Sequence, residues 1–172
     1  SWKSDYKLLI VKALKNTEGE IYLSKNPPNT ARIGVLLEMF PKAKFIHIHR
    51  NPVEVFLSTH NFFSKMLPHL QLQKLPQNTI DEMVFELYKN LMSDYLKQRD
   101  LIPKGNLVEL SFDRLQEDPM GVLNNIYKEL NLSGFEAAEP KFKTYVDSKK
   151  SYKKNTHKLT KSNLETLKDT CG

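Results

Sequence analysis

The stretch FPKAKFIHIHRNPVEVFLS, residues 40–58, decides how this chain is interpreted. Phe45, Ile46 and Ile48 lie within positions 44–49, which predicts a buried strand. The pair Asn51-Pro52 then predicts the start of a helix, because asparagine caps helices well and proline suits the first helical position. The stretch therefore predicts a strand that turns directly into a helix.

Two side chains of this stretch are candidate ligands for an anion. Arg50 lies where the predicted strand ends, and ligands of parallel α/β sheets bind beyond such ends. The free N–H groups of the following helix favour negative charge, and a guanidinium grips phosphate oxygens through two N–H donors. Ser58 follows roughly two helical turns later and would add one hydrogen bond. The alternative is that Arg50 pairs with a carboxylate and that Ser58 is simply exposed.

Hydrophobic periodicity predicts the other elements. Helices are expected over residues 5–15, 33–40 and 79–96, from Asp118 to near Gly134, and from Ser162; short strands are expected over residues 20–24 and 106–110. This alternation predicts an α/β fold, in which helices cover the faces of a sheet.

Three local signals refine this pattern. Asn29 or Thr30 is the expected cap of the helix over residues 33–40, and Thr79 with Glu82 forms a capping box. Residues 64–77 carry two prolines and are interpreted as a loop or a lid-like insertion.

Composition limits the class of protein. The 172 residues fit one domain over residues 1–172, and a content of 40% hydrophobic and 27% charged residues is typical of globular proteins. No run of about 18 apolar residues predicts a transmembrane segment. The single cysteine, Cys171, cannot form an internal disulfide, which favours a reducing, cytoplasmic setting.

Residues 40–58 resemble the 3′-phosphate-binding signature of the sulfotransferase family. The match comprises the Phe-Pro pair, the strand, the Arg-Asn-Pro turn and a serine eight residues after the arginine. In that family the arginine and the serine bind the 3′-phosphate of 3′-phosphoadenosine-5′-phosphosulfate (PAPS), so the resemblance assigns this role to Arg50 and Ser58. It also implies a P-loop-like three-layer fold with a mostly parallel sheet, PAPS as co-substrate and no metal.

Two further stretches resemble the same family. LVELSFDRLQEDPMGVLNNIYKELNL, residues 107–132, places Phe112 where a family tyrosine approaches the adenine. LSKNPPNTARIGVLLEMFP, residues 23–41, places Lys25 in a Lys-x-Pro turn, which implies a position near the transferred sulfuryl group and a role in offsetting transition-state charge. The alternatives are a core aromatic at Phe112 and an ordinary lysine at Lys25.

The C-terminal part of the chain is basic. Residues 141–172 contain nine lysines and three acidic residues, whereas the rest of the chain balances to zero within a net charge of +6. This excess suggests an anionic ligand or surface, or simply a solvated tail. It loosely resembles the mobile segment that covers the nucleotide in sulfotransferases, which makes candidate phosphate contacts of Lys149, Lys150, Tyr152 and Lys153.

The chain departs from the family in two places. The six glycines are isolated, so no phosphosulfate loop can be drawn, and we expect a domain that is incomplete at its N-terminal end or a degenerate relative. Cytosolic relatives carry a catalytic histidine after the lysine, whereas Asn26 follows Lys25 here. His60 and His69 are the remaining candidate bases.

The leading hypothesis is transfer of a sulfuryl group from PAPS to a hydroxyl or amine of a small-molecule, glycan or lipid acceptor. One alternative is a non-catalytic module that binds the nucleotide through its 3′-phosphate. Another is a nucleic-acid-binding protein, but the tail lacks arginine and has few aromatics for base stacking, so no nucleic acid is expected. A kinase with a P-loop fold is a further alternative.

Overall fold

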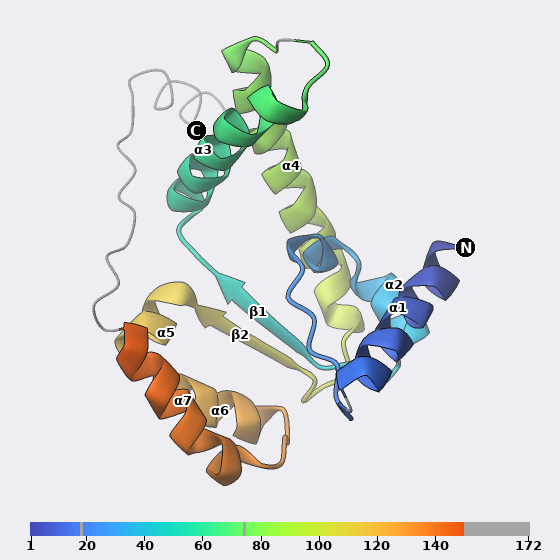
Figure 1. The fold of residues 1–172 in the computed structure, drawn as a ribbon, viewed down its shortest axis with the longest axis vertical. Coiled ribbons are helices and arrows are strands. Elements are labelled where there is room, and N and C mark those ends of the chain that lie inside the picture. Colours follow the sequence, from blue (N-terminus) through green and yellow to red (C-terminus); the bar gives the residue numbers. More distant parts are fainter. Residues whose placement is uncertain (18, 74, 150–172) are drawn as a thin grey trace.

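The computed structural model describes residues 1–17, 19–73 and 75–149, which form a mixed α/β structure that is mostly helical (Figure 1). In chain order the elements are α1 (Trp2–Thr17), the 3-10 helix η1 (Pro27–Ala31), α2 (Ile33–Met39), β1 (Phe45–His49), α3 (Pro52–Leu70), α4 (Gln77–Gln98), the 3-10 helix η2 (Arg99–Leu101), β2 (Leu107–Ser111), α5 (Phe112–Glu117), α6 (Pro119–Glu129) and α7 (Phe135–Lys149). The predicted α/β class is confirmed.

β1 and β2 form a parallel pair. The register aligns Phe45 with Leu107 at one end and His49 with Ser111 at the other. Both strands therefore end at the same level, and the residues that follow them leave the sheet side by side.

Helices pack against both faces of this pair (Figure 1). On one face, α6 covers β2 with a core that includes Val108, Leu110 and the nearly inaccessible Leu130. On the other face, Ile33 of α2 and Tyr95 of α4 pack with apolar residues from the starts of both strands. A third cluster joins α3 to α4 beyond the sheet.

Lys44, the basic residue before β1, connects the sheet to α6. Its ammonium donates hydrogen bonds to the carbonyl oxygens of Leu130 and Asn131, the second at 3.2 Å. These carbonyls lie at the C-terminus of α6, where a cation is favoured by unpaired acceptors and by the helix dipole. Lys44 therefore fixes the position of α6 relative to β1.

The predicted strand over residues 20–24 is wrong. These residues are irregular, and the side chains of Ile21 and Leu23 are each 84% exposed. A strand needs a neighbour for its backbone N–H and C=O groups, and no strand in the described part of the chain pairs with this segment.

Two predicted helix caps are also wrong. Residues 27–31 form η1 instead of leading directly into α2, whose N-cap is Arg32 without a side-chain bond. Gln98 of α4 holds this junction, because its amide accepts from Gly34 N at 2.9 Å. α4 itself begins at Gln77, before the expected capping box.

The predicted loop over residues 64–77 is mostly wrong as well. α3 continues to Leu70 with Pro68 inside it, so the irregular residues described between α3 and α4 are positions 71–73 and 75–76. Phe63 and Leu67 pack against the core between α3 and α4. Their burial favours helix up to the last turn, although Pro68 removes one backbone donor.

The start of the basic segment is helical. Residues 141–149 belong to α7, which packs on α6 through ring contacts among Tyr127, Phe135 and Phe142. The helix expected from Ser162 lies outside the described residues. None of the helices in the described ranges has the length and the apolar character needed to cross a membrane.

Candidate functional site

The carboxyl ends of β1 and β2 bring two predicted site residues together. Arg50 follows β1 directly, and Phe112 follows the aligned end of β2. The guanidinium carbon of Arg50 lies 4.6 Å from the centroid of the Phe112 ring. This distance is that of a cation–π contact.

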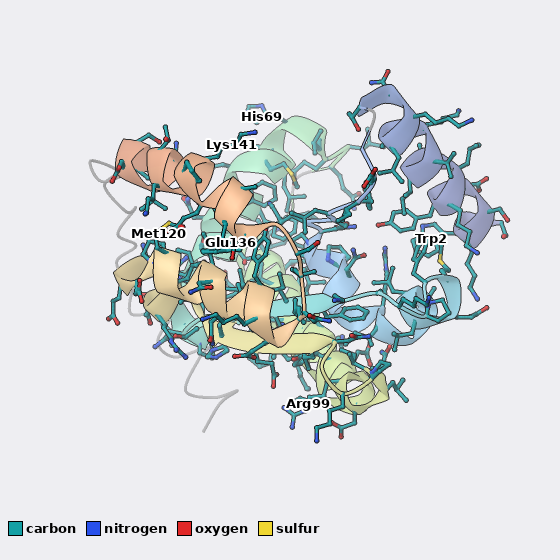
Figure 2. The ribbon with its side chains drawn as sticks, turned by 90° about the horizontal axis from the view of Figure 1, so that it is seen from below. Trp2, His69, Arg99, Met120, Glu136 and Lys141 are labelled. Carbon is teal, nitrogen blue, oxygen red and sulfur yellow. The ribbon has the colours of Figure 1, made fainter. Side chains whose placement is uncertain are left out.

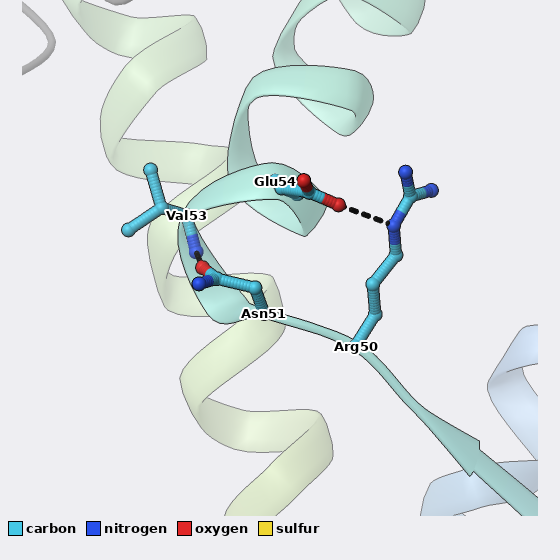
Figure 3. A network of polar contacts seen from close by, with 4 residues as sticks. All are labelled: Arg50, Asn51, Val53 and Glu54. Carbon is cyan, nitrogen blue, oxygen red and sulfur yellow. Dashed lines mark hydrogen bonds and ion pairs between the residues drawn. The ribbon is translucent and has the colours of Figure 1, made fainter. Parts of the chain in front are cut away.

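Local sequence signals fix the backbone on both sides of this contact. The side chain of Asn51 accepts a hydrogen bond from Val53 N at 2.9 Å and caps α3 (Figure 3). Ser111 similarly accepts from Arg114 N at 3.2 Å and caps α5. The predicted helix start at Asn51-Pro52 is confirmed, and both chains turn away from the sheet immediately after the strands.

Glu54 of α3 also holds Arg50. The Nε–H of Arg50 donates to Glu54 Oε2 at 2.7 Å (Figure 3). The arginine side chain is 28% exposed and the glutamate side chain is 46% exposed. Arg50 therefore does pair with a carboxylate. This contact uses only Nε, and no hydrogen bond within the described residues engages the terminal amino groups of the guanidinium, which can therefore donate to an anion.

Ser58 is exposed on α3. It follows Glu54 by four residues, so these two positions lie along one face of α3, whereas Arg50 precedes the helix. Ser58 lies about 10 Å along the helix axis from Asn51. Its role as a phosphate ligand stays a prediction.

The other predicted ligands are not part of the Arg50–Phe112 pair, and three of them lie outside the described residues. Lys25 is exposed in the irregular segment before η1, and its role near the sulfuryl group stays a prediction. Lys149 is the last residue of α7, with its ammonium 5.3 Å from the Tyr145 ring. The remaining three predicted contacts are outside the described residues: Lys150, Tyr152 and Lys153.

A polar cluster lies on the face of the sheet below the strand ends. Tyr95 of α4 donates a hydrogen bond from its hydroxyl to Glu109 of β2 at 2.5 Å, and Arg99 approaches the same carboxylate oxygen at 3.7 Å. The His47 ring stacks on Tyr95 with centroids 4.0 Å apart, and His49 lies beyond it. The cluster fixes α4 against the strands whose ends carry Arg50 and Phe112.

Burial shifts the pKa values of two members of this cluster. Desolvation lowers the pKa of His47, although the charge of Glu109 opposes this effect. Burial, and then the hydrogen bond to Glu109, raise the pKa of Tyr95 above its ordinary value. Both groups are therefore favoured in their neutral forms.

His60 and His69, the two candidate bases, differ in their surroundings. His60 Nε2 lies 2.8 Å from Asp81 Oδ1, so this pair joins α3 to α4, and Ser64 Oγ lies 3.4 Å from the same nitrogen. His69 is exposed near the outer end of α3 (Figure 2). Within the described ranges, no group of three or more His, Cys, Asp or Glu residues is arranged to hold a metal ion.

Glu54, Tyr95 and Glu109 were not predicted from the sequence. Glu54 could have been found from its spacing of four residues after Arg50, which suits an ion pair on a helix. Tyr95 fits the apolar pattern of its helix, and Glu109 interrupts a strand. Neither pattern indicates that the two side chains meet, because their contact depends on how α4 crosses the sheet.

The chain is similar in sequence to known sulfotransferases. A family model described as "Sulfotransferase family" matches residues 4–137. Two curated relatives, both named omega-hydroxy-beta-dihydromenaquinone-9 sulfotransferase Stf3, come from Mycobacterium bovis and Mycobacterium tuberculosis. Each is 36% identical over 136 residues, which cover 79% of this chain and 35% of the relative. The chain thus spans about a third of the length of these relatives. No solved structure matches the chain significantly.

Proposed function

The chain belongs to the sulfotransferase family, and from this premise we propose that the protein transfers a sulfuryl group from PAPS to a hydroxyl or amine acceptor. One observation carries the proposal. Arg50 lies at the carboxyl end of β1 and at the start of α3, with its guanidinium on the Phe112 ring and its terminal amino groups available for an anion.

We propose that Arg50 binds the 3′-phosphate of the nucleotide. The N-terminus of α3 adds a positive potential at the same place, and each charge-assisted hydrogen bond would contribute about 1.5–3 kcal/mol. Ser58 would donate from the next turns of α3. The ring of Phe112 packs on the guanidinium, and the family resemblance implies that it would also contact the adenine.

The reaction is an in-line substitution at sulfur. The bond from sulfur to the acceptor oxygen or nitrogen forms as that atom gives up its proton to a base, while the bond from sulfur to the bridging oxygen of PAPS breaks and adenosine 3′,5′-bisphosphate leaves. Such transfers depend mainly on positioning and on positive charge near the oxygens that gain negative charge. Arg50 would supply the positioning, and Lys25 is the candidate for the charge. His60, which is paired with Asp81, keeps a structural role in this proposal.

We propose that the domain has the P-loop-like three-layer architecture that the family resemblance implies. Parallel strands with helices on both faces agree with a P-loop-like three-layer domain, of which the described residues would form one part.

We propose a small-molecule or lipid alcohol as the acceptor. The curated relatives are named as sulfotransferases of a hydroxylated menaquinone derivative, which is a lipid with a terminal hydroxyl. An acceptor of this kind needs apolar contacts and one group that receives the hydroxyl proton.

The test is calorimetric titration of adenosine 3′,5′-bisphosphate into the full-length protein, its Arg50→Ala variant and an Arg32→Ala control. Arg32 also lies over an aromatic ring, that of Trp2, but away from the strand ends. We expect Arg50→Ala to weaken binding by about thirtyfold or more and Arg32→Ala to leave it unchanged. Equal binding by the wild type and Arg50→Ala would overturn the assignment. Binding without turnover of any acceptor would favour the non-catalytic module.

A further inference from the structure

Arg50 has a long side chain that can adopt many rotamers, yet two contacts restrain it in this structure. The Phe112 ring packs against the guanidinium, and Glu54 accepts a hydrogen bond from Nε. The two contacts come from different directions, one from the end of β2 and one from the first turn of α3. An arginine held in this way loses less conformational entropy when it binds an anion.

We infer that Glu54 is a positioning residue for the anion site: it holds the Nε edge of Arg50, so that the edge formed by the two terminal amino groups faces the phosphate. This inference rests on the proposed function of Arg50.

Glu54 accepts its hydrogen bond from Nε of Arg50 and not from a terminal amino group. A guanidinium can bind an oxyanion in a bidentate manner either through Nε and one terminal amino group or through both terminal amino groups. Glu54 occupies Nε, which removes the first arrangement. Figure 3 shows both terminal nitrogens directed away from the carboxylate, so the second arrangement remains open.

A structural role for Glu54 is the competing explanation. Glu54 is the acidic residue in the first turn of α3, where a carboxylate also stabilises the helix through its dipole. A loss of stability on substitution would therefore be uninformative. The informative quantity is the preference for a nucleotide that carries a 3′-phosphate, measured with Arg50 present and with Arg50 removed.

The experiment titrates adenosine 3′,5′-bisphosphate and adenosine 5′-monophosphate into the full-length protein and its Glu54→Ala, Arg50→Ala and doubly substituted variants. We expect Glu54→Ala to weaken bisphosphate binding by about tenfold, to change monophosphate binding by less than about twofold, and to have no further effect once Arg50 is alanine. Glu139→Ala is the matched control, because Glu139 pairs with Lys143 four residues away in α7 at 2.9 Å.

Glu54→Gln provides a second variant that keeps an acceptor oxygen and removes the charge. We expect an intermediate loss of about threefold, and this variant gives the answer if Glu54→Ala does not fold. Equal weakening of both nucleotides, the same loss without Arg50, or tighter bisphosphate binding would each overturn the inference. If the wild type does not prefer the bisphosphate, the proposed function itself fails; if it does and Glu54→Ala does not alter that preference, only the role of Glu54 fails.

Discussion

An arginine packs on an aromatic ring in two regions of the molecule, and the two pairs differ in their burial and in the elements around them. The Arg50 guanidinium lies 4.6 Å from the Phe112 ring at the aligned ends of two strands, and that of Arg32, the N-cap of α2, lies 5.3 Å from the Trp2 ring. Arg50 is half-buried and held by Glu54, whereas Arg32 is exposed and Trp2 is 46% exposed.

The candidate site is therefore defined by the strand ends and not by a cation–π contact alone. Behind Arg50 and Phe112 lie a parallel register, two capped helices and the core between β2 and α6. Around Trp2, the α1 residues Leu8 and Leu9 are exposed, at 52% and 62%, and only Ile10 of that helix is buried. The first region can hold side chains in fixed positions, and the second has few buried contacts with which to do so.

The largest expected difference between the regions is in stability. Leu130→Ala removes a side chain that is 1% exposed in the core between β2 and α6, so we expect the free energy of unfolding to fall by about 3 kcal/mol. Leu9→Ala in α1 should change it by less than about 0.5 kcal/mol. Chemical denaturation of the full-length protein measures both, and equal losses would contradict the contrast.

Arg50→Lys tests whether the site needs the guanidinium group or only its positive charge. Lysine keeps the charge but lacks the two parallel donors of the guanidinium and cannot pair through Nε, so affinity for adenosine 3′,5′-bisphosphate should fall by about tenfold. Arg32→Lys should leave it unchanged. Calorimetry compares the two variants, and an Arg50→Lys protein with wild-type affinity would show that charge alone is sufficient.

Phe112→Leu tests the ring contact. The variant keeps an apolar side chain but loses the aromatic face, which is expected to weaken bisphosphate binding by about threefold to fivefold. Trp2→Leu, which removes the corresponding ring from Arg32, is the control and should have no effect on the same titration. A larger effect of Trp2→Leu would mean that the N-terminal region contributes to the site.

The smallest expected effect is on the pH dependence of stability. Because burial lowers the pKa of His47, the folded state binds its proton less readily than the unfolded state. The stability that neutral His47 contributes is complete above about pH 6.5 and declines as the pH falls through the lowered pKa. His47→Gln should therefore flatten the profile of unfolding free energy between about pH 7 and pH 5. The exposed His69→Gln variant should keep the wild-type slope, and parallel slopes for all three proteins would remove His47 from the explanation.

Local signals in the sequence predicted the turn at the site. Asn51 caps α3 by its own side chain, and Asp118 caps α6 by accepting from Gly121 N at 2.9 Å. These bonds join residues two or three positions apart, so the sequence contains both partners. The same is true of the eight-residue spacing between Arg50 and Ser58, on which the family resemblance depends.

Tertiary structure decided the elements for which local signals were misleading. Residues 20–24 have strand-like composition but lack a neighbour in the described part of the chain, and they do not form a strand. Pro68 predicts a break, yet burial of Leu67 against α4 extends α3 past it. In both cases tertiary contacts decide the outcome: residues 20–24 lack a pairing strand among the described residues, and Leu67 packs against the core between α3 and α4.

The strand that ends just before Arg50 and the helix capped by Asn51 could be predicted from the sequence, because caps and spacings act over a few residues. The family resemblance of this turn depends on the same short spacings. Only the tertiary structure decided that Arg50 meets Phe112. That contact follows from the parallel register, which is set by hydrogen bonds between strands and by helices packed on both faces.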